Sequence, residues 1–353
     1  MTKIAVRSAL PTIILSLLIG LSSVSWSSTA FAQTDPLEIR GASDPAAASA
    51  LREVIVIGSD LLAAQRFYGE AAGMRASAPR TVPATVLTPL GINRPGSAVA
   101  FTRNIPGAAN VRVIAVRNAP APLRPDYVAL KLGGLAMGMP VASQSISEQR
   151  VTRAGFTSVV GPTTMTLART DGSNYKVGEI HYRAPDGVLV LGIDRGAMPP
   201  VGPIDPSSGI GGPAYASIVV ADLAGSEKFM REVLRFEKRR DTVFTRSESR
   251  GGLGLADGQR FAFQQWFAPG STTGYVILLK MLERPAGAAA HRAPHSGLAM
   301  LGFAAANLAA VEARARAGGF RVAAHPTRTF RSLIVEMPDG FPMEIAAFPR
   351  SVR

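Results

Sequence analysis

A fourfold internal repeat is the feature of this sequence that most limits the folds open to it. Residues 53–74, EVIVIGSDLLAAQRFYGEAAGM, match residues 215–236, YASIVVADLAGSEKFMREVLRF, in an apolar run, an Asp-Leu pair and a later aromatic residue. The two aspartates, Asp60 and Asp222, lie 162 residues apart. Because similarity at a fixed period indicates a recurring structural unit, we expect the fold to consist of copies of one unit.

A second pair of segments is interleaved with the first. Residues 148–163 and 312–327 share Glu, Gly-Phe and Pro-Thr, and both copies continue to a Pro-Asp-Gly turn followed by an apolar strand. The turn begins 23 residues after Pro162 but 12 residues after Pro326, so the first copy carries an insertion around the stretch TDGSNYK. The chain therefore contains units in the order A, B, A', B'.

Each unit has the signals of a strand, a helix and further strands. The β-branched runs VIVIG and SIVVA predict strands, and Asp60 and Asp222 stand where a helix N-cap is needed. The spacing of Phe229, Val233 and Phe236 gives the following helix one buried face. These signals predict four βαβββ units.

The N-terminal segment has the features of an export signal. Lys3 and Arg7 precede an apolar run, and Ala30-Phe31-Ala32 fits a cleavage site. An uncleaved anchor helix is the alternative, but the apolar run is shorter than the ~20 residues that a membrane span requires. We therefore expect a periplasmic or secreted protein with no stable membrane span. The expected segments are a signal peptide (1–32), a flexible leader (33–50), a first two-module domain (51–197), a Pro/Gly linker (198–212) and a second two-module domain (213–350).

Composition excludes several classes of site. The 353-residue chain has no cysteine, which excludes disulfides, thiolate metal sites and thiol nucleophiles. Its formal net charge is +13 at pH 7, and such a balance favours anionic ligands or surfaces. No basic run is interleaved with aromatic residues, so nucleic acid is not expected as a partner.

The repeated residues resemble those of the vicinal oxygen chelate superfamily, which includes glyoxalase I, bleomycin and fosfomycin resistance proteins and extradiol dioxygenases. The resemblance rests on Asp-Leu with a downstream aromatic residue, on Ala-Gly-Phe or Gly-Gly-Phe, and on Pro-Asp-Gly before a strand, in the same order in both halves. It implies an α+β fold in which four βαβββ modules pair into two cup-shaped mixed β-sheet domains. An unrelated α+β repeat is the alternative.

The resemblance also implies a place for a divalent metal ion. In metal-dependent members a histidine opens a module seven residues before the Asp-Leu aspartate, and a glutamate closes it six residues after the proline of Pro-Asp-Gly. The matching opening positions hold Glu53, Tyr215 and Met300, and the closing positions hold Leu191 and Glu344. Methionine, leucine and tyrosine are poor ligands for the ions of this family. We therefore expect no cofactor, and Glu344 and Glu53 are the candidates if a divalent metal binds.

An acid–base pair is the main catalytic candidate. In KVGEIHYRAPDG, Glu179 and His181 share one face of an alternating strand. Such a pair on the inner wall of a cup can act as general acid and base, whereas a pair that faces solvent would have no such role. Tyr215 is the candidate donor to a ligand.

Glu344 is the other catalytic candidate, because it lies in an otherwise apolar strand. A buried carboxylate needs a polar pocket or a cationic partner, and Arg321, Arg328 and Arg331 are near in sequence. We expect Glu179 and His181 in one cup, and Tyr215 and Glu344 in the other. The remaining histidines are expected in a loop or a turn, without a ligand role: His291, His295 and His325.

Two classes of function fit these residues. One is an exported lyase, isomerase or hydrolase that acts without a metal on a small oxygenated compound. The other is a protein that binds or sequesters such a ligand, anionic or aromatic, without transforming it. A metal-dependent dioxygenase or glyoxalase with displaced ligands is a third hypothesis. Several polar groups converging in one cup would favour an enzyme. The sequence leaves monomer and dimer open.

Overall fold

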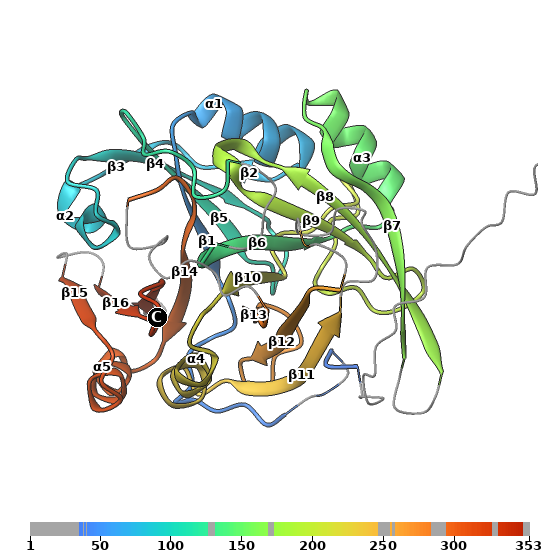
Figure 1. The fold of residues 1–353 in the computed structure, drawn as a ribbon. Coiled ribbons are helices and arrows are strands. Elements are labelled where there is room, and N and C mark those ends of the chain that lie inside the picture. The colour runs from blue at the N-terminus through green and yellow to red at the C-terminus, as the bar shows by residue number, and fades with distance from the viewer. Residues whose placement is uncertain are drawn as a thin grey trace, which may run out of the picture.

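The protein consists of two mixed β-sheets with helices on their outer sides (Figure 1). This computed structural model describes residues 35–37, 39, 41–125, 131–168, 173–245, 255, 258–283, 294–326 and 331–348. The expected signal peptide lies outside the described residues. The α+β class and the repeated modules are confirmed.

The nine-stranded sheet combines the first and fourth modules. Its strand order is β15-β16-β17-β14-β1-β5-β4-β2, and β3 pairs with β4. Its strands are β1 (Glu53–Gly58), β2 (Arg75–Ala76), β3 (Arg80–Val82), β4 (Gly96–Thr102), β5 (Asn110–Val116), β14 (Gly297–Ala305), β15 (Val322–Pro326), β16 (Arg331–Glu336) and β17 (Pro342–Ala347).

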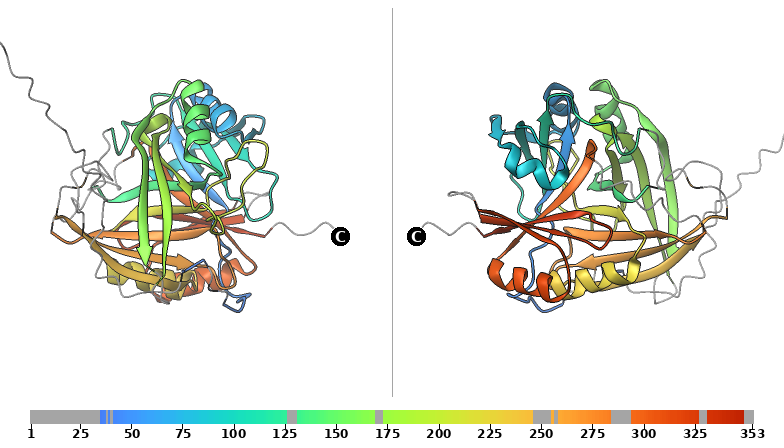
Figure 2. Two further views of the ribbon diagram at one scale, coloured as in Figure 1. Left: turned by 90° about the vertical axis from the view of Figure 1, so that its right-hand side faces the viewer. Right: turned by 60° about the vertical axis from the view of Figure 1, so that its left-hand side comes forward.

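The eight-stranded sheet combines the second and third modules, in the order β11-β12-β13-β10-β6-β9-β8-β7. Its long β7–β8 hairpin stands out in the left view of Figure 2. Its strands are β6 (Gly133–Pro140), β7 (Ser158–Ala168), β8 (Asn174–Arg183), β9 (Leu189–Asp194), β10 (Tyr215–Val219), β11 (Glu237–Thr245), β12 (Arg260–Phe267) and β13 (Tyr275–Met281).

Each sheet therefore takes one module from each half of the chain. The antiparallel pairs β1–β14 and β10–β6 join the modules. We expected Tyr215 and Glu344 to share a cup, and this is wrong: Tyr215 lies in the eight-stranded sheet and Glu344 in the nine-stranded sheet. The physical reason is that the first strand of each module has an open edge, which pairs with the first strand of a module from the other half. The boundaries 51–197 and 213–350 stay predictions.

The helices pair within each half of the chain, on opposite outer sides of the molecule (Figures 1 and 2). The π-helical turn η1 packs on α3, and η4 packs on α5. These helical elements are α1 (Leu61–Ala64) with η1 (Gln65–Ala71), α3 (Gln144–Arg153), α4 (Leu223–Lys228) with η4 (Phe229–Val233), and α5 (Leu308–Ala317).

The Pro-Asp-Gly turns connect the two modules of each half. The Oδ1 atom of Asp186 accepts hydrogen bonds from Ser59 N at 3.0 Å and from Ser59 Oγ at 2.9 Å. The Oδ2 atom of Asp339 accepts from Ala221 N at 2.7 Å and from Asp222 N. Each turn thus holds the loop that enters the first helix of the preceding module, so this motif has a structural role.

The predicted N-caps are confirmed. The side chain of Asp60 accepts from Leu62 N and Ala63 N, and that of Asp222 accepts from Gly225 N. These bonds satisfy amide groups that lack a partner within the helix. Gly155, with φ of 85°, follows α3 in a left-handed conformation that favours glycine.

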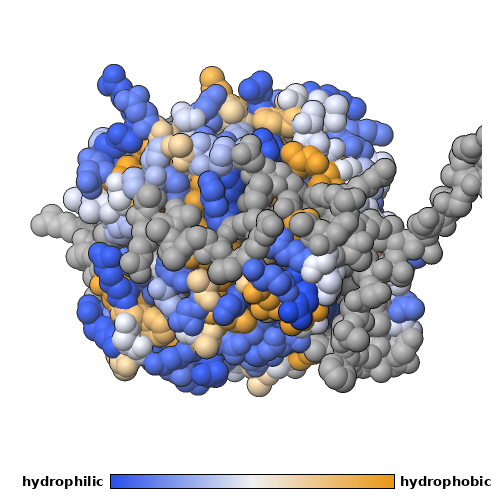
Figure 3. Space-filling model, in the orientation of Figure 1, coloured by the Kyte–Doolittle hydropathy of each residue, from blue (hydrophilic) through white to orange (hydrophobic). Residues whose placement is uncertain are grey.

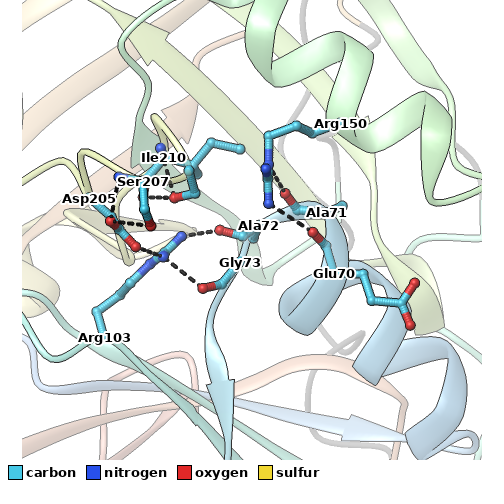
Figure 4. Close-up of polar contacts among 10 residues, drawn as sticks. Glu70, Ala71, Ala72, Gly73, Arg103, Arg150, Asp205, Ser207 and Ile210 are labelled. Atoms are coloured by element: carbon cyan, nitrogen blue, oxygen red, sulfur yellow. Dashed lines mark hydrogen bonds and ion pairs between the residues drawn. The ribbon is translucent and has the colours of Figure 1, made fainter.

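Two arginines and the linker fix the end of η1 (Figure 4). Arg103 Nη1 donates to Gly73 O at 2.7 Å and to Asp205 Oδ2 at 2.5 Å, and Nη2 donates to Ala72 O. Arg150, from α3, donates to Ala71 O at 2.9 Å. Because Asp205 belongs to the expected linker 198–212, this segment is anchored to the first module.

The leader is also anchored where it is described. Ala48 N donates to Leu234 O at 3.0 Å, and Ser49 N donates to Ala304 O at 2.8 Å. Asp35 is 3% exposed, and Leu37 packs against a buried hydrophobic cluster. Hydrogen bonds and burial therefore hold these described parts of the expected flexible leader (33–50) against the folded modules, and its bounds stay a prediction.

The buried hydrophobic residues that the structure describes form three clusters, and each cup has its own. One hydrophobic cluster fills the space between the outer faces of the sheets and the helices. A second cluster lines the eight-stranded cup, and a third lines the nine-stranded cup. In the nine-stranded cup, α2 (Ala84–Leu87) and η2 (Thr88–Leu90) cover the apolar floor, where Leu87 and Ile92 are buried.

Candidate functional site

A glutamate–histidine pair lies on the concave face of the eight-stranded cup. On β8, Tyr175 and Val177 belong to the cluster that lines this face, and Glu179 and His181 follow at alternate positions. His181 Nε2 lies 3.1 Å from Glu179 Oε2. The His181 side chain is 5% exposed and that of Glu179 is 23% exposed. The pair therefore faces the cup, with Glu179 as its more accessible member.

Stacked tyrosines lie across the cup from this pair. The rings of Tyr215 and Tyr275 stack at 5.1 Å, and Tyr275 stacks on Phe267 at 4.4 Å. Burial raises the pKa of Tyr215 well above its ordinary value, and Glu179 and Tyr275 add to this effect. Burial also raises the pKa of Tyr275, although Arg195 opposes it. Both hydroxyl groups therefore stay protonated at neutral pH and are available as hydrogen-bond donors.

Two arginines stand near Tyr175 in the same cup. The Arg195 guanidinium lies 5.4 Å from the centre of the Tyr175 ring, and Arg240 Nη2 donates to the Tyr175 hydroxyl at 3.5 Å. Arg195 Nη1 donates to Pro199 O at 2.6 Å, and Nη2 forms an ion pair with Asp35 of the leader. The cup thus combines an acid–base pair, tyrosine hydroxyls and cationic groups on an apolar floor.

The nine-stranded cup has a different polar group, an arginine held between two carboxylates. Arg112 of β5 donates from Nε to Glu53 Oε2 at 2.8 Å and from Nη2 to Glu344 Oε2 at 2.5 Å. Nη2 also contacts Glu53 Oε2. Ser332 Oγ donates to Glu344 Oε1 at 3.2 Å. The arginine partner of Glu344 is therefore Arg112.

Electrostatics favour this ion-paired arrangement. Burial lowers the pKa of Arg112, but the carboxylates of Glu344 and Glu53 outweigh it and raise that pKa. Burial raises the pKa of Glu53, which Arg112 opposes and Glu344 reinforces. Arg112 is therefore a permanent cation, with its Nη2 in contact with both carboxylates.

The other predicted partners and histidines lie elsewhere. Arg321 pairs with Glu336, and Arg328 and the side chain of Arg331 lie outside the described residues. His291 also lies outside them. His325 was expected in a turn, but this is wrong: it lies in β15, where it pairs with Ser332 of β16, and its side chain lies outside the described residues. His295 precedes β14 in a cleft of about 440 Å³ that also involves Leu90 and Pro342. Burial lowers the pKa of His295, and Nδ1 lies 3.2 Å from Ser296 O.

Comparison with known proteins links the second half of the chain to a family. The Glyoxalase/Bleomycin resistance protein/Dioxygenase superfamily matches residues 212–345, which span the third and fourth modules. Residues 212–345 therefore carry the sequence pattern of this superfamily. The earlier resemblance to the vicinal oxygen chelate superfamily is thereby confirmed.

Solved structures extend the likeness to the whole fold. A mutant of glyoxalase I from Zea mays superposes with a TM-score of 0.58 at 13% identity, over 84% of this chain and 92% of that one. Glyoxalase I from Zea mays itself gives 0.55 at 13% identity, over 84% and 92%. A candidate dioxygenase from Bacillus subtilis gives 0.54 at 13% identity, over 86% of each chain. No curated protein matches the sequence. At such identities the likeness concerns the fold alone.

Strand register shows which residues take the metal positions of this superfamily. Arg112 lies opposite Ile55 of β1, which comes two residues after the opening position Glu53. Glu344 lies opposite Gly302 of β14, which comes two residues after the opening position Met300. In the eight-stranded cup, the corresponding opening positions are Ala136 and Tyr215. Leu191 lies opposite Gly138, two residues after Ala136, and Ile277 lies opposite Ser217, two residues after Tyr215. The resulting sets are Glu53, Arg112, Met300 and Glu344 in one cup, and Ala136, Leu191, Tyr215 and Ile277 in the other.

Neither set fits a divalent metal. In the nine-stranded cup the Arg112 guanidinium already lies between the two carboxylates that would act as ligands, and it cannot lose its proton to become a ligand. In the eight-stranded cup the four side chains include three hydrocarbons. No group of three His, Asp or Glu residues within the described parts of the chain could hold a metal ion.

Several residues of the eight-stranded cup were not found from the sequence. No sequence signal marks Arg195, Arg240 and Tyr275, and only their contacts with Tyr175 or Tyr215 in one cup make them candidates. Arg112 could have been found by the signal that identified Glu344, because both are charged residues inside apolar strands. The catalytic roles of Glu179, His181, Tyr215 and Glu344 stay predictions.

Proposed function

We propose that the eight-stranded cup binds a small oxygenated organic compound and transfers one of its protons without a metal ion, as a lyase or isomerase does. The observation that carries this proposal is the Glu179–His181 contact of 3.1 Å on the concave face. Proton transfer requires an acid–base pair within hydrogen-bond reach, whereas passive binding does not.

The geometry suggests separate roles for the two residues. In the tautomer with a proton on Nε2, His181 donates to Glu179 Oε2 and orients the carboxylate. Because Glu179 is the more exposed of the two, its carboxylate is the group that would accept a proton from the ligand. Tyr215 and Tyr275 would donate hydrogen bonds to a ligand oxygen on which negative charge develops.

The nine-stranded cup supports proton transfer less well. Its two carboxylates are both held by the Arg112 guanidinium, which lies between them where a ligand would have to approach. We therefore assign Glu344 and Glu53 to stabilising this cup rather than to catalysis.

The surface is consistent with a small ligand. Figure 3 shows a face on which hydrophilic residues dominate and hydrophobic residues form small, separate groups. The large hydrophobic residues that are exposed in the described parts of the chain lie on different segments: Leu62, Ile146, Val243, Leu282 and Phe348. Among the helices in the described residues, none is long and apolar enough to cross a membrane.

Proton exchange into solvent tests the proposal directly. Chelator-treated protein is incubated in D₂O with a panel of small hydroxyketones and hydroxyacids, and exchange at the carbon beside the carbonyl group is followed by proton NMR. We expect Glu179→Gln to lower the exchange rate about 100-fold or more and His181→Ala to lower it about tenfold or more. The control is Glu312→Gln, on the outer helix α5, which should exchange at the wild-type rate.

Equal rates in wild type and Glu179→Gln would contradict the catalytic role. If a panel compound raises the melting temperature of the wild-type protein but the proton of that compound is never exchanged, the protein binds the compound without transforming it. The apolar floor and the tyrosine stack favour this second candidate function.

The proposal includes a location outside the cytoplasm, which rests on the N-terminal sequence alone. Mass spectrometry of the protein from a periplasmic or secreted fraction is expected to find a chain that begins at Gln33. A chain that still carries residues 1–32 would contradict export by cleavage.

A further inference from the structure

We propose that the ligand of the eight-stranded cup carries a carboxylate, that Arg195 anchors this group, and that Asp35 of the leader occupies the anchor as a tethered substitute. The inference deepens the proposed function, since it concerns the same cup and names the class of ligand.

Arg195 is a buried cation at the inner wall of the cup. Arg195 comes directly after β9. Because side chains alternate along a strand, it shares a face with Leu191 and Ile193, which belong to the cluster on the concave face. Its side chain is 3% exposed, and its guanidinium lies over the ring of Tyr175. A cation at this depth requires a compensating negative charge.

The compensating charge comes from outside the sheet. Asp35 lies 160 residues before Arg195, its side chain is also 3% exposed, and the two form an ion pair. The turn that presents the carboxylate is local, because Leu37 N donates to Asp35 Oδ1 at 3.1 Å. Leu37 in turn packs against the cluster that contains Tyr175 and Tyr275.

The nine-stranded cup provides an internal comparison. There the buried arginine is Arg112, and its two carboxylates, Glu53 and Glu344, come from strands of the sheet itself. Arg195 has instead a counter-charge on a short turn of the leader, which a free carboxylate could replace without disturbing any strand. This contrast favours a ligand-binding role for Arg195 over a purely structural one.

The surroundings define the rest of the ligand. Arginine binds carboxylates with two parallel hydrogen bonds, and the rings of Tyr175, Tyr275 and Phe267 offer apolar surface for an aromatic or hydrocarbon body. Glu179 pairs with Ile193, two residues before Arg195, so the backbone positions of Glu179 and the anchor lie roughly 7 Å apart along the strand direction. A small carboxylic acid spans that distance.

Benzoate is a suitable probe, and its binding is measured by calorimetry. Asp35→Ala should bind benzoate at least about tenfold more tightly than wild type, because the tethered carboxylate no longer competes. The matched control is Asp44→Ala, which removes another carboxylate of the leader, paired at 2.6 Å with the more exposed Arg235. It should bind benzoate as wild type does. Benzamide, which lacks the charge, should show no gain with Asp35→Ala.

Stability provides a second readout. Asp35→Ala leaves Arg195 buried without its counter-charge, so its melting temperature should fall and benzoate should restore it. Asp35→Asn, which preserves the shape of the side chain, should show the same rescue if the alanine variant folds poorly. Arg195→Gln added to either variant should abolish the gain in affinity.

No gain in benzoate affinity and no thermal rescue in the Asp35 variants would overturn the proposal and leave a structural ion pair. This outcome is separate from failure of the catalytic proposal. Benzoate binding to Asp35→Ala without proton exchange in any variant would retain the carboxylate anchor and remove catalysis, whereas exchange without a benzoate gain would do the reverse.

Discussion

The ring of Tyr215 lies over Gly138 of the neighbouring strand: a Cβ atom at Gly138 would fall 2.0 Å from Tyr215 Cε1. Gly138→Ala should therefore displace the ring and cost about 1–3 kcal/mol of unfolding free energy, as overpacking does. In a Tyr215→Leu background the same change should cost less than half as much. Urea denaturation of the four proteins measures this coupling.

Gly161→Ala is the matched control, because no atom lies within 4 Å of a Cβ at this strand position. If Gly138→Ala lowers the free energy of unfolding equally in both backgrounds, the position of the Tyr215 ring does not depend on the glycine.

Arg112→His should create a metal site in the nine-stranded cup. The Oε2 atoms of Glu53 and Glu344 both contact Arg112 Nη2, so they lie close enough to share one ion. With imidazole as a third ligand, the variant should bind about one Zn²⁺ per chain. Elemental analysis and Zn²⁺-dependent melting measure this.

In wild type, Zn²⁺ should not raise the melting temperature through this cup. Stoichiometric Zn²⁺ in wild type that is lost in Glu344→Ala would contradict the view that the guanidinium takes the metal position.

Asp186→Asn should stabilise the protein at neutral pH. Burial raises the pKa of Asp186. The hydrogen bonds from Ser59 oppose this increase, and the negative charge of Asp60 adds to it. A carboxyl group whose pKa is raised on folding makes the protein less stable as pH rises above the ordinary value of 3.8. Asparagine keeps the acceptor for Ser59 and tolerates the left-handed φ of 61°.

The advantage of Asp186→Asn should therefore be largest near pH 7 and shrink as pH falls toward 3.8. Denaturation at several pH values measures it. Asp186→Ala, which loses the acceptor, should be less stable than wild type. An advantage of asparagine that is independent of pH would contradict this electrostatic account.

Arg103→Ala should destabilise the first module by about 2–4 kcal/mol, because it leaves two carbonyl groups and Asp205 without their cationic donor. Asp205→Asn should cost only about 1 kcal/mol, since Arg103 keeps both carbonyl partners. Chemical denaturation compares the two variants. A larger cost for Asp205→Asn would mean that the linker, rather than the end of η1, is what Arg103 holds.

Local features of the fold could be predicted from the sequence because each depends on neighbouring residues. The repeat identified the modules, and Asp60 and Asp222 cap helices as expected. The alternation that placed Glu179 and His181 on one face is a property of a single strand.

The assembly of the cups depends on contacts between distant segments, and these were not predictable in the same way. Nothing local to Tyr215 shows that β10 pairs with β6 rather than with β14. The partner of Glu344 lies 232 residues earlier in the chain, and that of Arg195 lies in the leader. Sequence neighbours such as Arg321 were therefore misleading candidates.

A crystal structure of Asp35→Ala with benzoate would test most directly whether the eight-stranded cup is the ligand site. The account predicts a benzoate carboxylate paired with Arg195 and a ring against Tyr175 and Tyr275, within reach of Glu179. Benzoate bound at Arg112 in the nine-stranded cup, or an Arg195 side chain with no benzoate beside it, would contradict the account.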